Sequence, residues 1–156
     1  MSAPIYQVGT EGAVALVAAT AKSVIGVRAH ANSGVMLVGF RVGFDGVTAS
    51  AVPVLVELGY CTFATNSPGT NSTSTTARQR NGRSLAAGFT AGKNWTTAPT
   101  VITVLDEWLL TPNGGLVVLD SPLGTEVDSA LAEGFVLRLT APAVVNVRAS
   151  MQVSRI

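Results

Sequence analysis

Few side chains in this sequence could serve as a nucleophile or a base. His30 is the only histidine and Cys61 is the only cysteine, so a Ser–His or Cys–His nucleophile would have to use His30. That residue lies in the sequence RAHANSG, at a strand-to-turn junction without a nucleophile elbow, and Cys61 is followed by Thr-Phe without a recognisable motif. We expect His30 to be a turn residue, and we expect no catalytic residues and no enzymatic activity.

The carboxylates form two small groups. Asp106 and Glu107 are adjacent, and because adjacent strand residues point to opposite faces, they cannot form an acid–base pair without a bulge. Asp120, Glu126 and Asp128 surround an expected turn but lack the spacing of a calcium-binding loop. One cysteine excludes an intrachain disulfide and a multi-cysteine metal site, and no Gly-rich loop precedes a helix. We expect surface carboxylates, no metal and no cofactor.

Basic residues concentrate at Arg78, Arg80 and Arg83, with Lys93 a little further on. Three arginines in a polar loop can contact nucleic-acid phosphates, but the interleaved aromatic residues of a single-strand platform are missing. The planar guanidinium is equally suited to bidentate contact with carboxylates of a partner subunit. We favour the protein partner, and a net charge of +1 predicts no general attraction to nucleic acid or membrane.

The two tryptophans differ in their neighbours. Trp95 lies in the polar sequence KNWT, so we expect it to be exposed and, with Arg78, Arg80 and Arg83, to contact a partner. An exposed tryptophan can stack on sugar rings, which leaves a glycan- or host-binding module open as an alternative. Trp108 precedes Leu109-Leu110 and is predicted to join the core.

Period-two alternation of apolar and polar residues predicts strands along most of the chain. The clearest is 35–44, with an apolar row of Met36, Val38, Phe40, Val42 and Phe44. Other strands are predicted at 54–60, 135–140 and 144–154, and weaker ones at 14–19, 24–29, 100–105 and 116–119. The connection 46–53 is short enough for strands 35–44 and 54–60 to pair antiparallel. Without a convincing amphipathic helix, this pattern predicts a single all-β domain over 1–156, an antiparallel β-sandwich that is jelly-roll-like.

Single charges lie on the polar faces of the best strands. They are Arg41, Glu57, Glu107, Arg138 and Arg148. We expect some of them to pair across strands, because opposite charges facing each other contribute about 0.2–1 kcal/mol each and help to fix the register.

Two segments lack the strand pattern of their surroundings. Residues 65–84 are almost entirely polar, and 85–95 add scattered hydrophobic residues, so 65–95 is predicted to be a long loop excursion. Residues 1–12 are predicted to form an N-terminal arm. We expect both to reach over neighbouring molecules, because extended arms can wrap a large surface and order on docking. A plain mobile loop is the alternative for the excursion.

The composition predicts a surface that other protein covers. Charged residues make up 12% of the chain and hydrophobic residues 47%, with a mean hydropathy of +0.43, whereas ordinary globular proteins contain about 25% charged residues. The most apolar run, 12–21, is too short to cross a bilayer of about 30 Å. No basic start precedes an apolar stretch at 1–10, so we expect no Sec export.

Several turn and strand signatures together resemble a group of small structural proteins of tailed bacteriophages. They are VAATAK at 17–22, AHAN at 29–32, VGFDG at 42–46, AVPV at 51–54, EW at 107–108, TPNGG at 111–115, PLG at 122–124 and LTAPAVVNVRA at 139–149. The resemblance spans most of the chain apart from 65–95, where the sequence diverges.

This resemblance implies a jelly-roll fold, often trimeric, a structural role as a capsid decoration or minor head protein, and no catalytic residues to carry over. The expected partners are further copies of the chain and the major capsid protein. The expected location is the outer surface of the phage head, after synthesis in the host cytoplasm. A tail or baseplate component is a second structural alternative.

Overall fold

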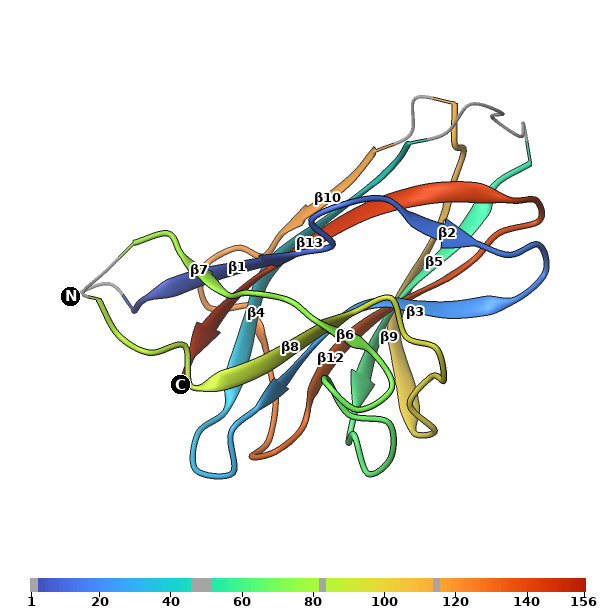
Figure 1. Cartoon of the computed structure of the whole chain (residues 1–156). Coiled ribbons are helices and arrows are strands. Elements are labelled where there is room, and N and C mark those ends of the chain that lie inside the picture. Colours follow the sequence, from blue (N-terminus) through green and yellow to red (C-terminus); the bar gives the residue numbers. More distant parts are fainter. Residues whose placement is uncertain (1–2, 46–51, 82–83, 114–115) are drawn as a thin grey trace.

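The computed structural model describes residues 3–45, 52–81, 84–113 and 116–156. Its secondary structure is entirely β, arranged as two antiparallel sheets that pack face to face (Figure 1). This arrangement confirms the predicted all-β sandwich, while jelly-roll connectivity stays a prediction. Each of the eight predicted strand ranges overlaps an observed strand. Within the described ranges, no helix is long and apolar enough to cross a membrane.

One sheet has seven strands and the other has six. The seven-stranded sheet has the order β10-β4-β13-β1-β7, with β11 beside β4 and β2 beside β13. Its strands are β1 (Ile5–Gly9), β2 (Val14–Leu16), β4 (Val35–Phe44), β7 (Arg78–Gln79), β10 (Leu116–Asp120), β11 (Val127–Asp128) and β13 (Val145–Arg155). The six-stranded sheet has the order β6-β8-β3-β12-β5-β9. Its strands are β3 (Ala21–Ala29), β5 (Val54–Cys61), β6 (Thr73–Ser74), β8 (Phe89–Lys93), β9 (Ile102–Leu110) and β12 (Gly134–Thr140).

The main core lies between the two sheets and is built by alternation. On β13 every second residue is apolar, as expected for the strand predicted at 144–154, and this row is buried; its members are Val145, Val147, Ala149, Met151 and Val153. The facing strand β12 contributes the buried residues Phe135, Leu137 and Leu139. Because period-two spacing places one row on each face, the alternate residues of β13 form the outer face of the seven-stranded sheet.

The alternation predicted for β4 is correct only in its second half. Phe40 and Val42 are buried, as expected, but at the start of the strand Leu37 is buried while Met36 and Val38 are partly exposed. The cause is a bulge: Gln152 of β13 pairs with Gly39, whereas Val153 pairs with Leu37, so Val38 has no opposite residue. One extra residue reverses the direction of every side chain that precedes it.

The predicted pairing of 35–44 with 54–60 is wrong. β4 pairs with β13, β10 and β11 in one sheet, while β5 pairs with β12 and β9 in the other. Residues 46–51 of the connection lie outside the described residues. Each of these strands therefore finds its partners late in the sequence, which a short connection alone does not indicate.

The two segments predicted to be arms contribute strands to their own domain. Residues 5–9 of the N-terminal segment form β1, which pairs with β13 and β7 and buries Tyr6 and Val8. The excursion 65–95 contains β6, β7 and β8, and it passes from the six-stranded sheet at β6 to the seven-stranded sheet at β7. Polar residues form these strands because an edge strand needs only backbone partners and one covered face.

Candidate functional site

Four arginines share the outer face of the seven-stranded sheet, and we call this surface the arginine face. Arg41 lies between the buried residues Phe40 and Val42 of β4, so its side chain must point outward. The same alternation turns Arg148 outward on β13. On β7, Arg78 is the Cα partner of Gln7, and the backbone N–H of Arg80 bonds to the carbonyl of Ile5. The neighbouring strands β4, β13, β1 and β7 therefore form the arginine face, although they are far apart in the sequence. Its arginines are Arg41, Arg78, Arg80 and Arg148.

Small residues form the floor of the arginine face and leave it hollowed. Gly9 of β1 and Ser150 of β13 are paired, and Ser150 is also paired with Arg41. Three adjoining hollows of about 390, 520 and 440 Å³ lie here. Gly9 and Glu11 line the first and second, Arg41 lines the first and third, and Arg80 lines the second and third. Arginine side chains therefore stand beside shallow depressions with a floor of small residues.

Two of the arginines are already paired within the chain. Arg148 Nε donates to Asp45 Oδ2 at 2.8 Å, and Arg78 Nη2 lies 3.7 Å from Glu11 Oε1. Arg41 and Arg80 form no ion pair with any residue of the described ranges. These two line the same hollow, together with Gln152 and Asp120. The arginine face thus presents two guanidinium groups whose donors are available to an external acceptor.

Comparisons with family models, with curated proteins and with solved structures find no match to this chain. What the arginine face can bind therefore follows from its own chemistry. A guanidinium fork binds carboxylates or phosphates, and two such groups, Arg41 and Arg80, line one hollow.

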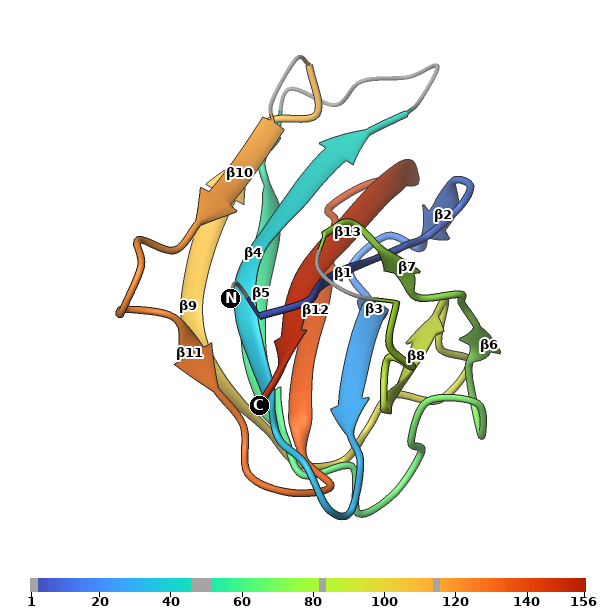
Figure 2. The same cartoon turned by 90° about the vertical axis from the view of Figure 1, so that its left-hand side faces the viewer.

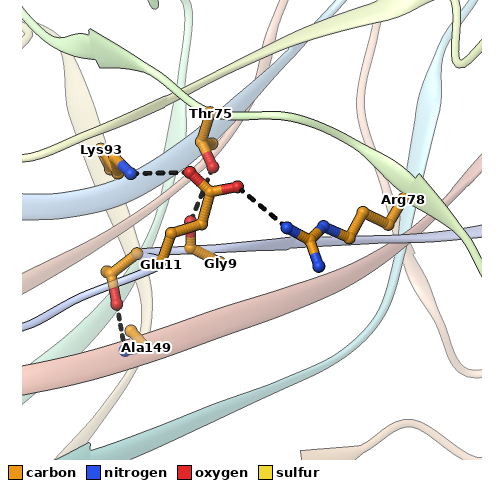
Figure 3. A network of polar contacts seen from close by, with 7 residues as sticks. Gly9, Glu11, Thr75, Arg78, Lys93 and Ala149 are labelled. Atoms are coloured by element: carbon orange, nitrogen blue, oxygen red, sulfur yellow. Dashed lines mark hydrogen bonds and ion pairs between the residues drawn. The ribbon is translucent and has the colours of Figure 1, made fainter.

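Glu11 connects the two sheets beside the arginine face (Figure 3). Its carboxylate accepts a hydrogen bond from Lys93 Nζ of β8 at 2.7 Å, while Arg78 approaches from β7 of the other sheet. The hydrogen bond from Lys93, helped by the charges of Lys93 and Arg78, holds the pKa of the Glu11 carboxyl below its ordinary value against the opposing effect of desolvation. Thr75 Oγ1 donates to the carbonyl of Gly9 at 2.7 Å and ties the crossing segment to β1.

Of the four predicted contact residues, Arg78 and Arg80 are exposed on β7 and its end, and Arg83 lies outside the described residues. The prediction that Trp95 is exposed is wrong, because its side chain is only 3% exposed. Its indole Nε1 donates to the carbonyl of Asn66 at 2.8 Å. Trp95 packs with Cys61, Phe63 and Val136 in a second cluster outside the six-stranded sheet.

Two glycines make room for the Trp95 ring. A Cβ at Gly26 of β3 would lie 3.0 Å from Trp95 Cη2, and one at Gly92 of β8 would lie 3.1 Å from the same atom. The indole therefore lies on the sheet where two adjacent strands carry no side chains. The polar neighbours of Trp95 in the sequence gave no sign of this. Its burial removes Trp95 as a stacking surface for the glycan-binding alternative.

The prediction that some strand-face charges pair across strands is confirmed for Glu57 and Arg138. They are Cα partners on β5 and β12, with Arg138 Nε and Nη2 each donating to Glu57 at 2.8 Å. The hydrogen bonds to Glu57 raise the pKa of Arg138, which desolvation opposes. Glu107 of β9 is the next residue in this row, directly opposite Glu57. The side chains of Arg138 and Glu57 are 29% and 10% exposed, and the pair acts as a structural contact.

The candidate catalytic residues are not brought together. His30 is exposed in the turn after β3, where its Nδ1 accepts a hydrogen bond from the Asn32 N–H. Cys61 is buried, and its burial raises the pKa of the thiol. Asp106 accepts a hydrogen bond from the N–H of Glu107, and both are exposed on β9. No three His, Cys, Asp or Glu side chains within the described ranges are placed to hold a metal ion.

Proposed function

We propose that this chain is a structural protein of a phage virion, a decoration protein that binds the outer surface of the head and braces neighbouring capsid subunits. Two sequence features support this proposal, namely the resemblance to small virion proteins and the low content of charged residues, 12%. The observation that carries it is the arginine face, where Arg41 and Arg80 line one hollow without an ion-pair partner in the described part of the chain.

The form of the arginine face favours a protein partner. It is a broad surface across four strands, β4, β13, β1 and β7, and its hollows are shallow. Arginine is enriched at protein interfaces and forms paired hydrogen bonds with carboxylates. Most aromatic residues of the described chain are occupied in the core, as with Tyr6 and Phe40. Phe44 alone among them lines these hollows, whereas single-stranded nucleic acid ordinarily stacks on several aromatic side chains.

Binding to isolated heads tests the proposal. Heads of the phage that encodes the chain, purified from a mutant lacking this gene, are mixed with the purified protein and sedimented. We expect the wild-type protein to sediment with the heads, and the variant carrying Arg41→Glu and Arg80→Glu to bind at least about tenfold more weakly, because like charges then face an acidic partner. Arg155→Glu is the matched control, since Arg155 is exposed but lies at the end of β13, away from the hollows.

Electron cryomicroscopy of the reconstituted particles locates the protein. Density on the outside of the head supports the decoration role, whereas density confined to the tail supports the tail or baseplate alternative. Absence of the protein from both, with no sedimentation on heads, overturns the virion proposal.

A further inference from the structure

Charges of opposite sign are separated along the sequence. Between residues 58 and 93 the chain contains four basic residues, Arg78, Arg80, Arg83 and Lys93, and no acidic residue. Between 94 and 137 it contains six acidic residues and no lysine or arginine. The near-neutral total of +1 therefore hides two oppositely charged segments.

The strands that carry most of these charges lie at opposite edges of the sandwich (Figure 2). β7 ends the seven-stranded sheet, and β6 and β8 end the six-stranded sheet on the same side, where Arg78 and Arg80 are exposed. We call this the basic edge. At the other end of both sheets lie β9, β10 and β11, which with their connections form the acidic edge. It carries Asp106, Glu107, Glu126 and Asp128. Asp120 of β10 also lies on this side, but it lines a hollow together with Arg41 and Arg80.

The acidic edge also exposes apolar side chains. β9 is nine residues long, borders only β5, and has no buried residue. Leu109 is 72% exposed, and Val104 and Leu105 are 39% and 44% exposed. A long edge strand with exposed hydrophobic residues is a surface that proteins ordinarily cover. The charges beside these residues indicate what covers them.

We infer that the acidic edge of one copy docks on the basic edge of the next copy, so that the chain associates head to tail. Pairing of β9 with β9 of another copy is disfavoured, because Asp106 and Glu107 near the middle of the strand would face like charges. Docking on the basic edge instead places these carboxylates near Arg78 and Arg80, and it buries the side chains of Leu105 and Leu109 away from water. This inference rests on the proposed function, for it names a second copy as the protein partner of the β7 arginines.

Head-to-tail contact has a consequence for the assembly. Each contact uses two different surfaces, so every copy can bind one neighbour on each side, and the chain closes into a ring or continues as a filament. Opposite charges set the orientation and speed of association, whereas the buried apolar area supplies most of the affinity. The association should therefore weaken with salt without being abolished by it.

Two charge-reversal variants test the inference. Variant B carries Arg78→Glu and Arg80→Glu on the basic edge, and variant A carries Asp106→Lys and Glu107→Lys on the acidic edge. All four side chains are exposed, so thermal melting is expected to show both variants folded. By sedimentation velocity up to about 100 µM, the wild type should form oligomers, and each variant alone should show at least about tenfold weaker association.

An equimolar mixture of the two variants provides the decisive comparison. Variant B keeps the native acidic edge and variant A keeps the native basic edge, so these two edges can still meet. Head-to-tail docking therefore predicts that the mixture recovers oligomers containing both variants, which native mass spectrometry resolves by mass. The Arg155→Glu variant serves as the control and should associate like the wild type.

Three results would overturn the inference. They are a wild type that stays monomeric over this concentration range, an oligomer that survives both reversals, and a loss of association by variant A alone, which would indicate β9–β9 contact. The head-binding assay is read separately. A monomeric protein that still sediments with phage heads would remove head-to-tail docking and leave the virion proposal standing, whereas failure of both assays would remove both.

Discussion

At the edge formed by β6, β7 and β8 the chain covers its own strands, whereas along the edge formed by β9, β10 and β11 it leaves them open (Figure 2). The crossing segment between β6 and β7 spans both sheets at the basic edge and is held by Thr75 and by the Glu11 ion pairs. No residue of β9 at the acidic edge is buried.

The two tryptophans show the same difference. Trp95 lies near the basic edge, is almost fully buried and has its indole N–H bonded to a carbonyl. Trp108 lies on β9, remains partly exposed and packs edge-on against Phe40 with ring centroids 5.3 Å apart. The long polar excursion therefore completes the fold at one edge, whereas β9 at the other edge leaves apolar side chains exposed. Variants of the packed residues near the basic edge should therefore change stability more than matched variants on β9.

The largest effect is expected for Trp95→Ala. Removing this ring empties the second cluster and leaves the carbonyl of Asn66 without its donor, so the free energy of unfolding should fall by about 3–5 kcal/mol. Urea denaturation followed by circular dichroism measures it. Trp108→Ala is the matched comparison and should cost only about 1–3 kcal/mol, because part of its ring already contacts water. Equal losses would contradict the contrast between the edges.

A somewhat smaller effect is expected for Arg138→Gln on β12, two strands in from the edge strand β9. The substitution leaves the carboxylate of Glu57, 10% exposed, beside Glu107 without its charge partner. Unpaired buried charges are costly, so the loss should be about 2–4 kcal/mol by urea denaturation at neutral pH. The control Arg148→Gln breaks an exposed pair with Asp45 and should cost less than about 1 kcal/mol. A smaller loss of unfolding free energy for Arg138→Gln than for Arg148→Gln would show that the Glu57 carboxylate is solvated.

Thr75→Val should cost about 1 kcal/mol, the usual net contribution of one hydrogen bond. It removes the donor to the Gly9 carbonyl that ties the crossing segment to β1. Thr103→Val on the open strand β9 is the isosteric control and should change the stability of the isolated chain by less than about 0.5 kcal/mol. Hydrogen exchange of the β7 amides should quicken in the first variant alone; unchanged exchange would mean that Thr75 does not hold this segment.

The smallest effect on stability is expected for Glu11→Gln, and this effect depends on pH. The folded-state pKa of Glu11 is lowered by Lys93 and Arg78, so its contribution is present above the unfolded-state pKa and is lost as the pH falls through the folded-state value. Thermal melting of wild type and variant should therefore differ at neutral pH and converge in acid. A difference that persists or grows below about pH 3 would contradict the ion-pair role of Glu11.

Much of the fold was predictable from residues with a strong alternation. β13 and β12 follow the expected pattern because each buries one complete row of side chains. The bulge at Val38 was not predictable, since it depends on the register against β13. β1, β7 and β8 were missed because short or polar segments become strands only through their partners, which lie far away in the sequence.

The candidate site was predictable only in part. Arg78 and Arg80 were identified from their clustering, and Arg41 and Arg148 from their outward positions on apolar strands. That all four share one sheet face depends on the strand order, which one sequence does not contain. Trp95 was misassigned because the space for its ring comes from Gly26 and Gly92, two glycines on other strands.

Electron cryomicroscopy of the assembled protein, on the head or as a free oligomer, tests the edge-to-edge contact most directly. We predict that β9 of one copy, with Leu105 and Leu109, lies against Arg78 and Arg80 on β7 of the next copy. A map in which like edges meet, or in which β9 faces solvent in the complete assembly, would contradict it.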